Sequence, residues 1–397
     1  MLRIIVRDFC IGTNISGMDI AFWEREMGLT NCDVLIVGAG IVGLSAGIAL
    51  RKTSPELRIT VIDRSPFSDG GSTRNAGFAC FGSPRELLDD CDANGETEML
   101  ENVRRRWKGL QLLLGELGSE SIGYQATGSL EIAHRHPSSD CPATLPEEVD
   151  WLNAKLAPIT RVKSTFVTAP NHVLSGLDSV SMSSIWYSPL EGMLHSGQMM
   201  LALERLAATA GIVVRRGLNV ESLERNANGT ATLRLRPAFS NQPGAFAVSP
   251  PRTLLAINGL TGQFLEDAEV ERVPNQVLVT SKLSEGLPKC PMHAESGYVY
   301  ARPLPSGQML IGGGRHWVGI SPEEREARLV EWLRRTVPGT VHAKVEMRWT
   351  GYLGVGPSKH TRVESLAPHL FGAWRLGGMG VATGMAIGQE LARLSGK

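Results

Sequence analysis

Residues 34–50 read VLIVGAGIVGLSAGIAL and contain no charged side chain. A buried strand is predicted over 33–37 and a helix over 41–52, with the pattern GAGIVG at 38–43 between them. The first glycine permits a tight turn, the second lets a pyrophosphate approach the backbone, and the third lets the helix pack on the strand. A membrane span is the competing interpretation, but four glycines and a length at the lower limit for a span argue against it. The stretch therefore predicts a phosphate-binding turn in an α/β domain.

The next predicted strand, at 58–63, ends in an acidic residue. Asp63 follows Gly43 by twenty residues, a spacing at which a carboxylate accepts hydrogen bonds from ribose hydroxyls and repels a 2′-phosphate. Strand, glycine turn, helix, strand and acid in this order predict a bound dinucleotide far more specifically than the glycine pattern alone.

Two further stretches favour FAD over a nicotinamide cofactor. The small residues of GGSTRNAGFACFGSP, 70–84, let the backbone approach an extended cofactor, and Arg74 and Asn75 offer donors to phosphate and ribityl oxygens. The stretch GGMGVATG, 377–384, places a second glycine turn before the last helix, whose N-terminus can stabilise negative charge on a reduced flavin.

The composition limits the partners. The 397 residues exceed one ordinary domain, and 40 basic residues balance 40 acidic ones, which favours a small-molecule partner over nucleic acid or an anionic membrane. Six scattered cysteines without a C-x-x-C pair predict a reduced, cytoplasmic protein with no structural metal. Residues 1–30 are interpreted as an N-terminal extension without a signal-peptide pattern, in which Met18 is a candidate start.

The order of the predicted elements indicates an interrupted domain. Nucleotide-type segments lie near both ends and in the middle, whereas the strands NQVLVTSKL, GYVYARPL and GQMLIGGGRH form an antiparallel run between them. The expected fold is α/β, with a Rossmann-like FAD-binding domain assembled from 31–90, 185–265 and 350–397. An antiparallel-sheet substrate or cap domain, 91–184 and 266–349, is inserted into it.

The chain resembles the D-amino-acid-oxidase-type FAD oxidoreductases, which include glycine, sarcosine and γ-glutamylputrescine oxidases. The resemblance rests on several stretches in one order: DVLIVGAGIVGLSAGIAL, STRNAGF, GMLHSGQMMLALERLA, LLAINGLTG, GYVYARPLPSGQMLIGGGR, RWTGYLGVGP and RLGGMGVATG. It implies FAD as cofactor, a two-domain α/β fold, and removal of a hydride from a carbon that bears an amine.

The resemblance also implies the cofactor contacts. They run from the pyrophosphate and adenosine ribose through the loop after the second strand to the flavin ring. The residues are Gly38, Gly40, Ile41, Val42, Gly43, Asp63, Arg64, Ser72, Thr73, Arg74, Asn75, Ala76, Gly77, Val220, Asn258, Gly259, Gly378, Met379, Gly380 and Val381.

On the substrate side, Tyr298, Tyr300 and Arg302 share one strand face by alternation. The resemblance puts this strand above the flavin, where Arg302 would pair with a substrate carboxylate; an interdomain ion pair for Arg302 and a core position for Tyr300 are the alternatives. Relatives that bind a carboxylate carry an arginine near TGFRP, but this chain has TGYLG, with Leu353 at that position. A simple D-amino acid bound in the usual way is therefore not expected.

Several other side chains leave alternatives open. Lys359 and His360 would lie near the flavin, where a lysine favours oxygen activation, or else form a solvated pair. His195 approaches the flavin or is a satisfied junction residue, and similar alternatives apply to His316. Cys80 is a covalent attachment point for FAD or, by preference, a small buried residue beside the flavin.

The function predicted from the sequence is that of an FAD-dependent amine or amino-acid oxidoreductase. It would remove a hydride next to an amine and give an imine that hydrolyses, and the flavin would return its electrons to O2 or a carrier. The family's chemistry depends on orientation and needs no dedicated base. The alternatives are an FAD-dependent 2-hydroxy-acid dehydrogenase and a flavin-dependent RNA-modifying enzyme. The oligomeric state stays open.

Overall fold

A six-stranded sheet carries the glycine turn. The computed structural model describes residues 31–135, 142–238 and 244–396, so the predicted extension at 1–30 lies outside the described residues. In this sheet, the strands that flank β1 run parallel to it, and only the edge strand β18 is antiparallel to its neighbour. The order is β18 (Arg362–Ala367), β19 (Leu370–Trp374), β12 (Arg252–Leu255), β1 (Val34–Val37), β2 (Ile59–Asp63) and β8 (Val213–Arg216). Strands from both ends and the middle of the chain meet here, which confirms a Rossmann-like domain assembled from separated segments.

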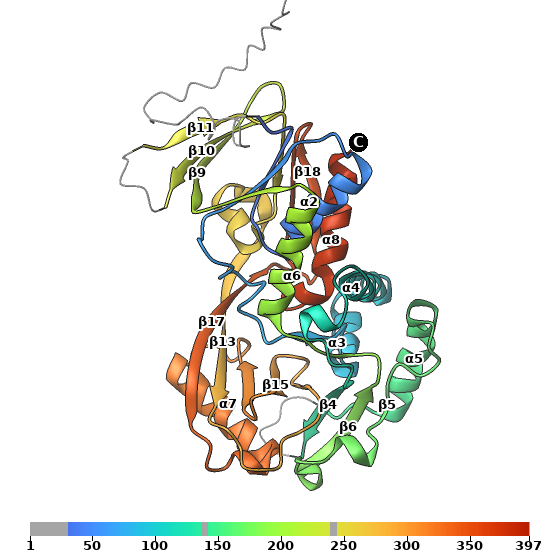
Figure 1. Ribbon diagram of the computed structural model, residues 1–397. Coiled ribbons are helices and arrows are strands. Elements are labelled where there is room, and N and C mark those ends of the chain that lie inside the picture. Colours follow the sequence, from blue (N-terminus) through green and yellow to red (C-terminus); the bar gives the residue numbers. More distant parts are fainter. Residues whose placement is uncertain (1–30, 136–141, 239–243, 397) are drawn as a thin grey trace, which may run out of the picture.

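Helices α2 (Ile41–Thr53), α6 (Ser196–Thr209) and α8 (Gly380–Ser395) lie beside this sheet, with α2 packed between the other two (Figure 1). The first turn of α2 has no acidic residue, and its last turn holds Arg51 and Lys52, which complement the helix dipole. Gly388 of α8 and Ser45 of α2 allow close packing, since a Cβ on Gly388 would lie 2.5 Å from that of Ser45. The positive N-terminus of α2 is thus fixed against the carboxyl end of β1.

The second half of the molecule is built on an eight-stranded sheet, drawn below the first one in Figure 1. Its order is β17 (Val345–Val355), β13 (Glu271–Thr280), β16 (Met309–Gly313), β15 (Val299–Pro303), β14 (Met292–Ala294), β4 (Ser129–His134), β6 (Met182–Ser188) and β5 (Val167–Thr168). Neighbouring strands are antiparallel except β14 and β4, which are parallel. Helix α7 (Pro322–Thr336) covers this sheet at β13 and β16. The antiparallel substrate-side sheet expected from the sequence is therefore present.

Smaller elements complete the two halves. Strands β9 (Leu218–Arg225), β10 (Ala231–Pro237) and β11 (Phe246–Val248) form a three-stranded sheet, and β3 (Phe78–Ala79) pairs with β7 (Gly192–Met193). Helices α3 (Pro84–Asn94), α4 (Glu96–Leu117) and α5 (Pro146–Thr160) lie to one side. Short 3₁₀ helices lie at Glu120–Ile122, Asn171–Val173, Ser179–Ser181, Asn258–Gln263, Glu266–Ala268 and Pro338–Thr340. Across the described residues, no helix combines the length and apolarity that crossing a bilayer requires.

The predicted domain boundaries differ from the observed packing in several places. Helix α4 packs along α8, and Leu110 and Leu113 share one apolar core with Ile41, although 91–117 was expected in the inserted domain. Residues 185–188 of β6 and 350–355 of β17 belong to the eight-stranded sheet, although both were expected in the FAD-binding domain. The amphipathic pattern of α4 predicts which face of the helix is buried, but it does not predict which of the two cores that face packs against.

Candidate active site

A cavity of about 380 Å³ opens at the carboxyl ends of β1, β2 and β12, above the start of α2. Most of the residues predicted to contact a dinucleotide line it: Gly38, Gly40, Ile41, Val42, Asp63, Arg64, Ser72, Thr73, Arg74, Asn75, Val220, Asn258, Gly259, Gly378, Gly380 and Val381. Gly43 does not line it. A Cβ on Gly43 would lie 1.9 Å from the Gly38 carbonyl oxygen, so this glycine lets α2 approach β1.

The backbone of the glycine turn is shaped to receive an anion. Gly38 has φ +106°, and a Cβ there would lie 2.5 Å from the Ala256 carbonyl oxygen. The Ile41 N–H at the start of α2 donates to Ser72 Oγ (3.0 Å), and the Ala39 N–H donates to Asp63 Oδ2 (2.8 Å). A helix N-terminus without acidic neighbours in its first turn favours phosphate at this position. The turn therefore fits the pyrophosphate of a dinucleotide.

The loop between β2 and β3 is stiffened by its own side chains. Asn75 Nδ2 donates to the Ser72 carbonyl (2.8 Å), while its Oδ1 accepts from the Gly77 N–H (2.8 Å) and from Ser196 Oγ (2.6 Å). The exposed Arg74 donates to the Thr350 carbonyl (3.4 Å). The side-chain amide of Asn75, which the sequence assigned to the cofactor, thus holds the loop in shape.

A second cavity of about 480 Å³ continues from the first. The two share walls at Arg74, Asn75, Gly378 and Val381, among other residues, and the second is also lined by Ala76, Gly77 and Met379. The eight-stranded sheet supplies Asn275, His293 and Tyr300 to its opposite wall, where Tyr298 precedes β15 and Arg315 follows β16. This continuity gives room for an extended ligand that begins at the glycine turn and ends beside the sheet.

The sheet-side wall is polar but uncharged at its centre. Asn275 Nδ2 donates to Tyr300 Oη at 2.5 Å, and burial raises the pKa of Tyr300 to about 12. Burial also lowers the pKa of His293 to about 4, so both side chains are neutral near pH 7. The Phe78 ring lies edge-on to the rings of His293 and Tyr300, with ring centroids 4.9 Å and 5.4 Å apart.

Arg302 does not face either cavity, which corrects the expectation that it meets a substrate carboxylate. Its Nη1 donates to the carbonyls of Ala76 (3.1 Å), Gly77 (2.8 Å) and Leu194 (2.7 Å), and its side chain is buried. Alternation correctly puts Arg302 on the side of its strand that meets the loop, but the long side chain ends beneath the loop backbone. Arg302 therefore supports the loop that lines the cavities.

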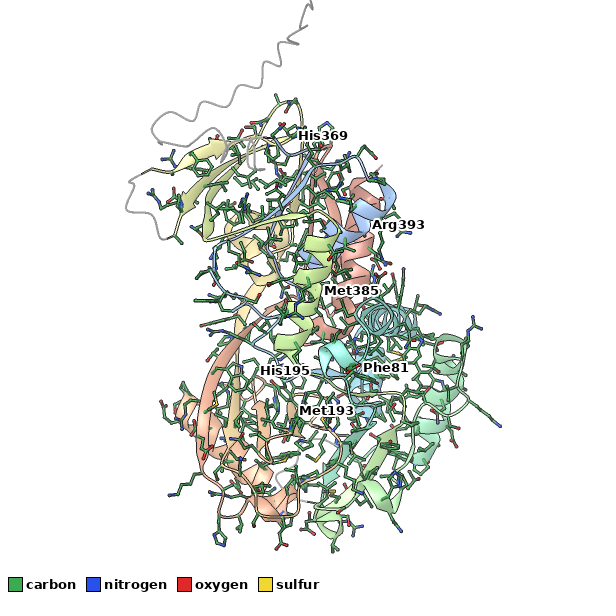
Figure 2. The ribbon with its side chains drawn as sticks, in the orientation of Figure 1. Phe81, Met193, His195, His369, Met385 and Arg393 are labelled. Carbon is green, nitrogen blue, oxygen red and sulfur yellow. The ribbon has the colours of Figure 1, made fainter. Side chains whose placement is uncertain are left out.

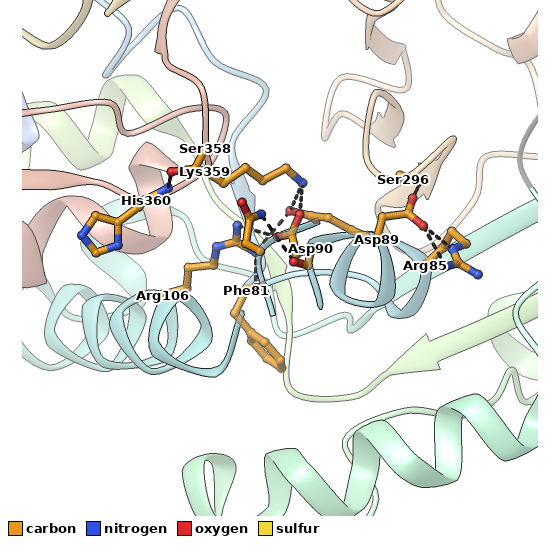
Figure 3. A network of polar contacts seen from close by, with 11 residues as sticks. Phe81, Arg85, Asp89, Asp90, Arg106, Ser296, Ser358, Lys359 and His360 are labelled. Atoms are coloured by element: carbon orange, nitrogen blue, oxygen red, sulfur yellow. Dashed lines mark hydrogen bonds and ion pairs between the residues drawn. The ribbon is translucent and has the colours of Figure 1, made fainter. Parts of the chain in front are cut away.

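Lys359 lines the second cavity as the half-buried member of a charge cluster, defined here as Glu86, Asp90, Arg106 and Lys359 (Figure 3). Lys359 Nζ lies 2.5 Å from Asp90 Oδ1 and 3.6 Å from Glu86 Oε1, and Arg106 Nη1 lies 3.1 Å from the same Glu86 oxygen. Burial lowers the pKa of Lys359, but the two carboxylates outweigh burial and raise it overall. The positive charge of Lys359 is therefore matched within the cluster.

Neither His360 nor His195 reaches a cavity. His360 points away from the charge cluster in Figure 3, and its backbone N–H donates to Ser358 Oγ (3.3 Å). His195 caps α6 by accepting the Gln198 N–H on Nδ1 (3.3 Å), at the junction of the two halves next to Met193 (Figure 2). His316 lies outside the cavity linings too, with Nε2 2.7 Å from Glu295 Oε2.

Several lining residues escaped the sequence prediction. Arg272 and Tyr352 line the first cavity, with the Arg272 guanidinium carbon 3.5 Å from the centre of the Tyr352 ring. Arg315 lies over the Tyr298 ring at 4.4 Å. The position of Arg315 directly after GGG was a usable signal, because a glycine turn at the end of a strand exposes the next side chain. The sequence around Arg272 contains no pattern that indicates a cavity-lining residue.

Comparison with known proteins agrees with this geometry. The sequence model of a family described as "FAD dependent oxidoreductase" (DAO) matches residues 33–394. The chain belongs to this DAO family. Its cofactor is FAD, and the glycine turn, the anion-favouring start of α2 and the continuous cavities fit an extended FAD. The phosphates would meet Gly38 and Gly40, and the ring end would lie towards Gly378 and Met379.

Individual DAO relatives are distant. The chain is 24% identical over 353 residues to the bifunctional protein ThiO/ThiG of Synechocystis sp., covering 83% of this chain but only 47%, about half, of that relative. It is 24% identical over 379 residues to γ-glutamylputrescine oxidoreductase of Escherichia coli, covering 91% of this chain and 83% of the relative. The L-proline dehydrogenase structure from P. horikoshii superposes with a TM-score of 0.71 at 16% identity, over 92% and 93% of the two chains. This structural likeness establishes the shared fold.

Proposed function

We propose that the chain removes a hydride from the carbon next to an amine, converting an amine or amino acid to an imine that water hydrolyses. The observation that carries the proposal is the continuity of the two cavities, which leads from the glycine turn to a chamber walled by Tyr300 and His293. When bound, FAD supplies the hydride acceptor for such a reaction. The names of two relatives, a γ-glutamylputrescine oxidoreductase and an L-proline dehydrogenase, support an amine or amino acid as substrate.

The neutral wall of the chamber suits an uncharged amine. Tyr300 accepts a hydrogen bond from Asn275, which leaves the Tyr300 hydroxyl proton free to donate into the cavity. His293 is uncharged near pH 7 because it is buried. The wall at Tyr300 and His293 offers an ammonium ion no carboxylate, and the lining carboxylates Glu86 and Asp90 are paired with Arg106 and Lys359. The neutral amine is the form that can lose a hydride. The chain thus contributes orientation and desolvation, and the reaction needs no dedicated base.

Arg315 is the candidate for holding a substrate carboxylate. Of the described arginines and lysines that line the second cavity, Arg106 and Lys359 pair with Glu86 and Asp90, and Arg375 pairs with Glu269. Arg74 lies on the side of the cofactor loop. Arg315 is held over the Tyr298 ring with no carboxylate at ion-pair distance among the described residues. The resemblance implies a carboxylate-binding arginine at the position of Leu353, and a leucine cannot make that contact. We therefore assign the carboxylate contact to Arg315.

The deciding experiment is anaerobic reduction of the bound flavin. The FAD-loaded protein is mixed with amines, amino acids and 2-hydroxy acids, and bleaching of the visible flavin bands is followed. Bleaching by an amine or amino acid supports the proposal, and bleaching by hydroxy acids alone selects the dehydrogenase alternative. If no compound of the three classes reduces the flavin, the proposal is wrong. Admission of air then separates an oxidase, whose colour returns at once, from an enzyme that needs a carrier.

A further inference from the structure

Three side chains of different chemistry meet beneath the second cavity. The ligand-type atoms of Cys80, Glu191 and His293 all lie within 4.8 Å of one another, and all three residues are buried. Cys80 and His293 also line the second cavity. The residues are far apart in sequence, so no spacing pattern indicated the cluster, and the sequence predicted no metal.

The fold brings them together through two strand pairings. Strands β3 and β7 pair with Ala79 opposite Gly192, which sets Cys80 and Glu191 side by side just beyond the ladder. His293 lies at the centre of β14, opposite Tyr300 of β15. All three positions are thus fixed by backbone pairing, as a preorganised site requires.

The carboxylate of Glu191 is oriented by its surroundings. Its Oε1 accepts hydrogen bonds from the backbone N–H groups of Phe81 (2.6 Å) and Gly82 (3.3 Å), and its Oε2 accepts from the Ser129 hydroxyl. A carboxylate has about four acceptor positions, so the fourth is available to a partner from the cluster itself. Outer hydrogen bonds of this kind hold metal-ligating carboxylates in place.

The imidazole of His293 has an unused nitrogen. The side chain is more than nine-tenths buried, and Nε2 has no hydrogen-bond partner among the described residues. Buried polar atoms are nearly always partnered, so an orphaned nitrogen on a ring that belongs to this cluster points to a missing ligand. The depressed pKa of His293 keeps the ring in the neutral form that metals bind.

From this arrangement we propose that Cys80, Glu191 and His293 form a binding site for a zinc-type divalent cation. Thiolate, imidazole and carboxylate are the donors that zinc takes, and three protein ligands leave a fourth position, here towards the second cavity. Three atoms 4.8 Å apart lie about 2.8 Å from their common centre, while zinc takes sulfur at about 2.3 Å and nitrogen at about 2.0 Å. Each side chain would therefore move by less than about 1 Å. On binding, the thiol proton of Cys80 leaves to solvent as the sulfur–metal bond forms.

The test uses the FAD-loaded protein and zinc itself. Wild type, Cys80→Ser, His293→Gln and the control Cys91→Ser are incubated with one equivalent of zinc chloride, dialysed against metal-free buffer and assayed by elemental mass spectrometry. Cys91 lies on α3 outside the cluster, so this control removes a thiol without removing a ligand. Wild type and Cys91→Ser should retain close to one zinc per chain, and the two ligand variants at least about tenfold less. Flavin absorption and melting temperature check that each variant is folded.

A second measurement needs no variant. X-ray absorption of the zinc-loaded wild type should show one sulfur near 2.3 Å together with nitrogen or oxygen ligands. Negligible zinc in the wild type, equal retention in all four proteins, or a zinc without sulfur would each overturn the proposal. None of these readouts depends on catalytic activity, so the metal site and the proposed function stand or fall separately.

Discussion

Arg302 Nη1 lies 2.8 Å from the carbonyl oxygen of Gly77 and so fastens β15 of the eight-stranded sheet to the loop that lines both cavities. The guanidinium lies among carbonyls, without a carboxylate at ion-pair distance among the described residues. Its burial lowers the pKa of Arg302 to about 10, which still leaves it charged near pH 7. A buried cation that donates only to neutral carbonyls holds the loop in position.

Replacing Arg302 is therefore expected to affect folding and FAD binding more than substrate choice. Arg302→Met removes the guanidinium from the carbonyls of Ala76 and Leu194 and leaves the Gly77 carbonyl only the Leu194 N–H, at a cost of about 2 kcal/mol or more in the free energy of unfolding. Arg302→Lys should recover part of this. Denaturant unfolding and FAD retention measure the effect, with Arg334→Met on the exposed face of α7 as control. An Arg302→Lys protein with wild-type stability and a raised KM only for carboxylate substrates would show that Arg302 binds substrate.

Gly38 is expected to tolerate no side chain. Gly38→Ala forces an L-residue to φ +106° and puts its Cβ 2.5 Å from the Ala256 carbonyl, a strain of at least about 1 kcal/mol before any clash is counted. FAD affinity should fall by at least about tenfold, because a displaced turn moves the positive N-terminus of α2 away from the pyrophosphate. Gly115→Ala on the exposed side of α4 is the matched control, since a Cβ there meets nothing within 4 Å and the residue lines neither cavity. Equal FAD dissociation constants for both variants would contradict the assigned turn.

Arg315 is expected to govern the preference for a carboxylate. Arg315→Gln removes a charge-assisted contact of about 1.5–3 kcal/mol, so kcat/KM for an amino acid should fall by roughly 10- to 100-fold. The amine that lacks the carboxylate should lose little. Steady-state kinetics on one such pair, found in the flavin-reduction panel, gives the ratio, and Arg328→Gln on exposed α7 is the control. Equal losses for both substrates would remove Arg315 from the carboxylate site.

The sequence predicts best what lies close together in the chain. The turn at Gly38, the acid at Asp63 and the parallel sheet follow from short patterns, because each involves neighbouring segments whose geometry is locally determined. Alternation gives the strand face of Arg302 but not the loop that covers it. Cys80 and Glu191 meet only because β3 and β7 pair across a long separation, and such a contact leaves no local pattern.

The titration of Glu191 is expected to lower the free energy of unfolding as the pH rises. Burial raises its pKa from 4.5 to about 7, so between these values the folded chain binds a proton that the unfolded chain has released. The stabilisation is complete below pH 4.5 and is lost as the pH passes 7. The shift corresponds to roughly 3 kcal/mol.

Glu191→Gln removes this titration and keeps an oxygen that accepts from Phe81 and Gly82. The difference in unfolding free energy between wild type and variant should therefore change by up to roughly 3 kcal/mol between pH 4.5 and 7.5, in favour of the variant at the higher pH. Taking the difference cancels His293, whose depressed pKa gives a slope of opposite sign. Urea unfolding at a series of pH values in the presence of a chelator measures it, with Glu56→Gln on an exposed turn as control. A wild-type-minus-variant difference that stays constant with pH would mean that Glu191 is already ionised at pH 5.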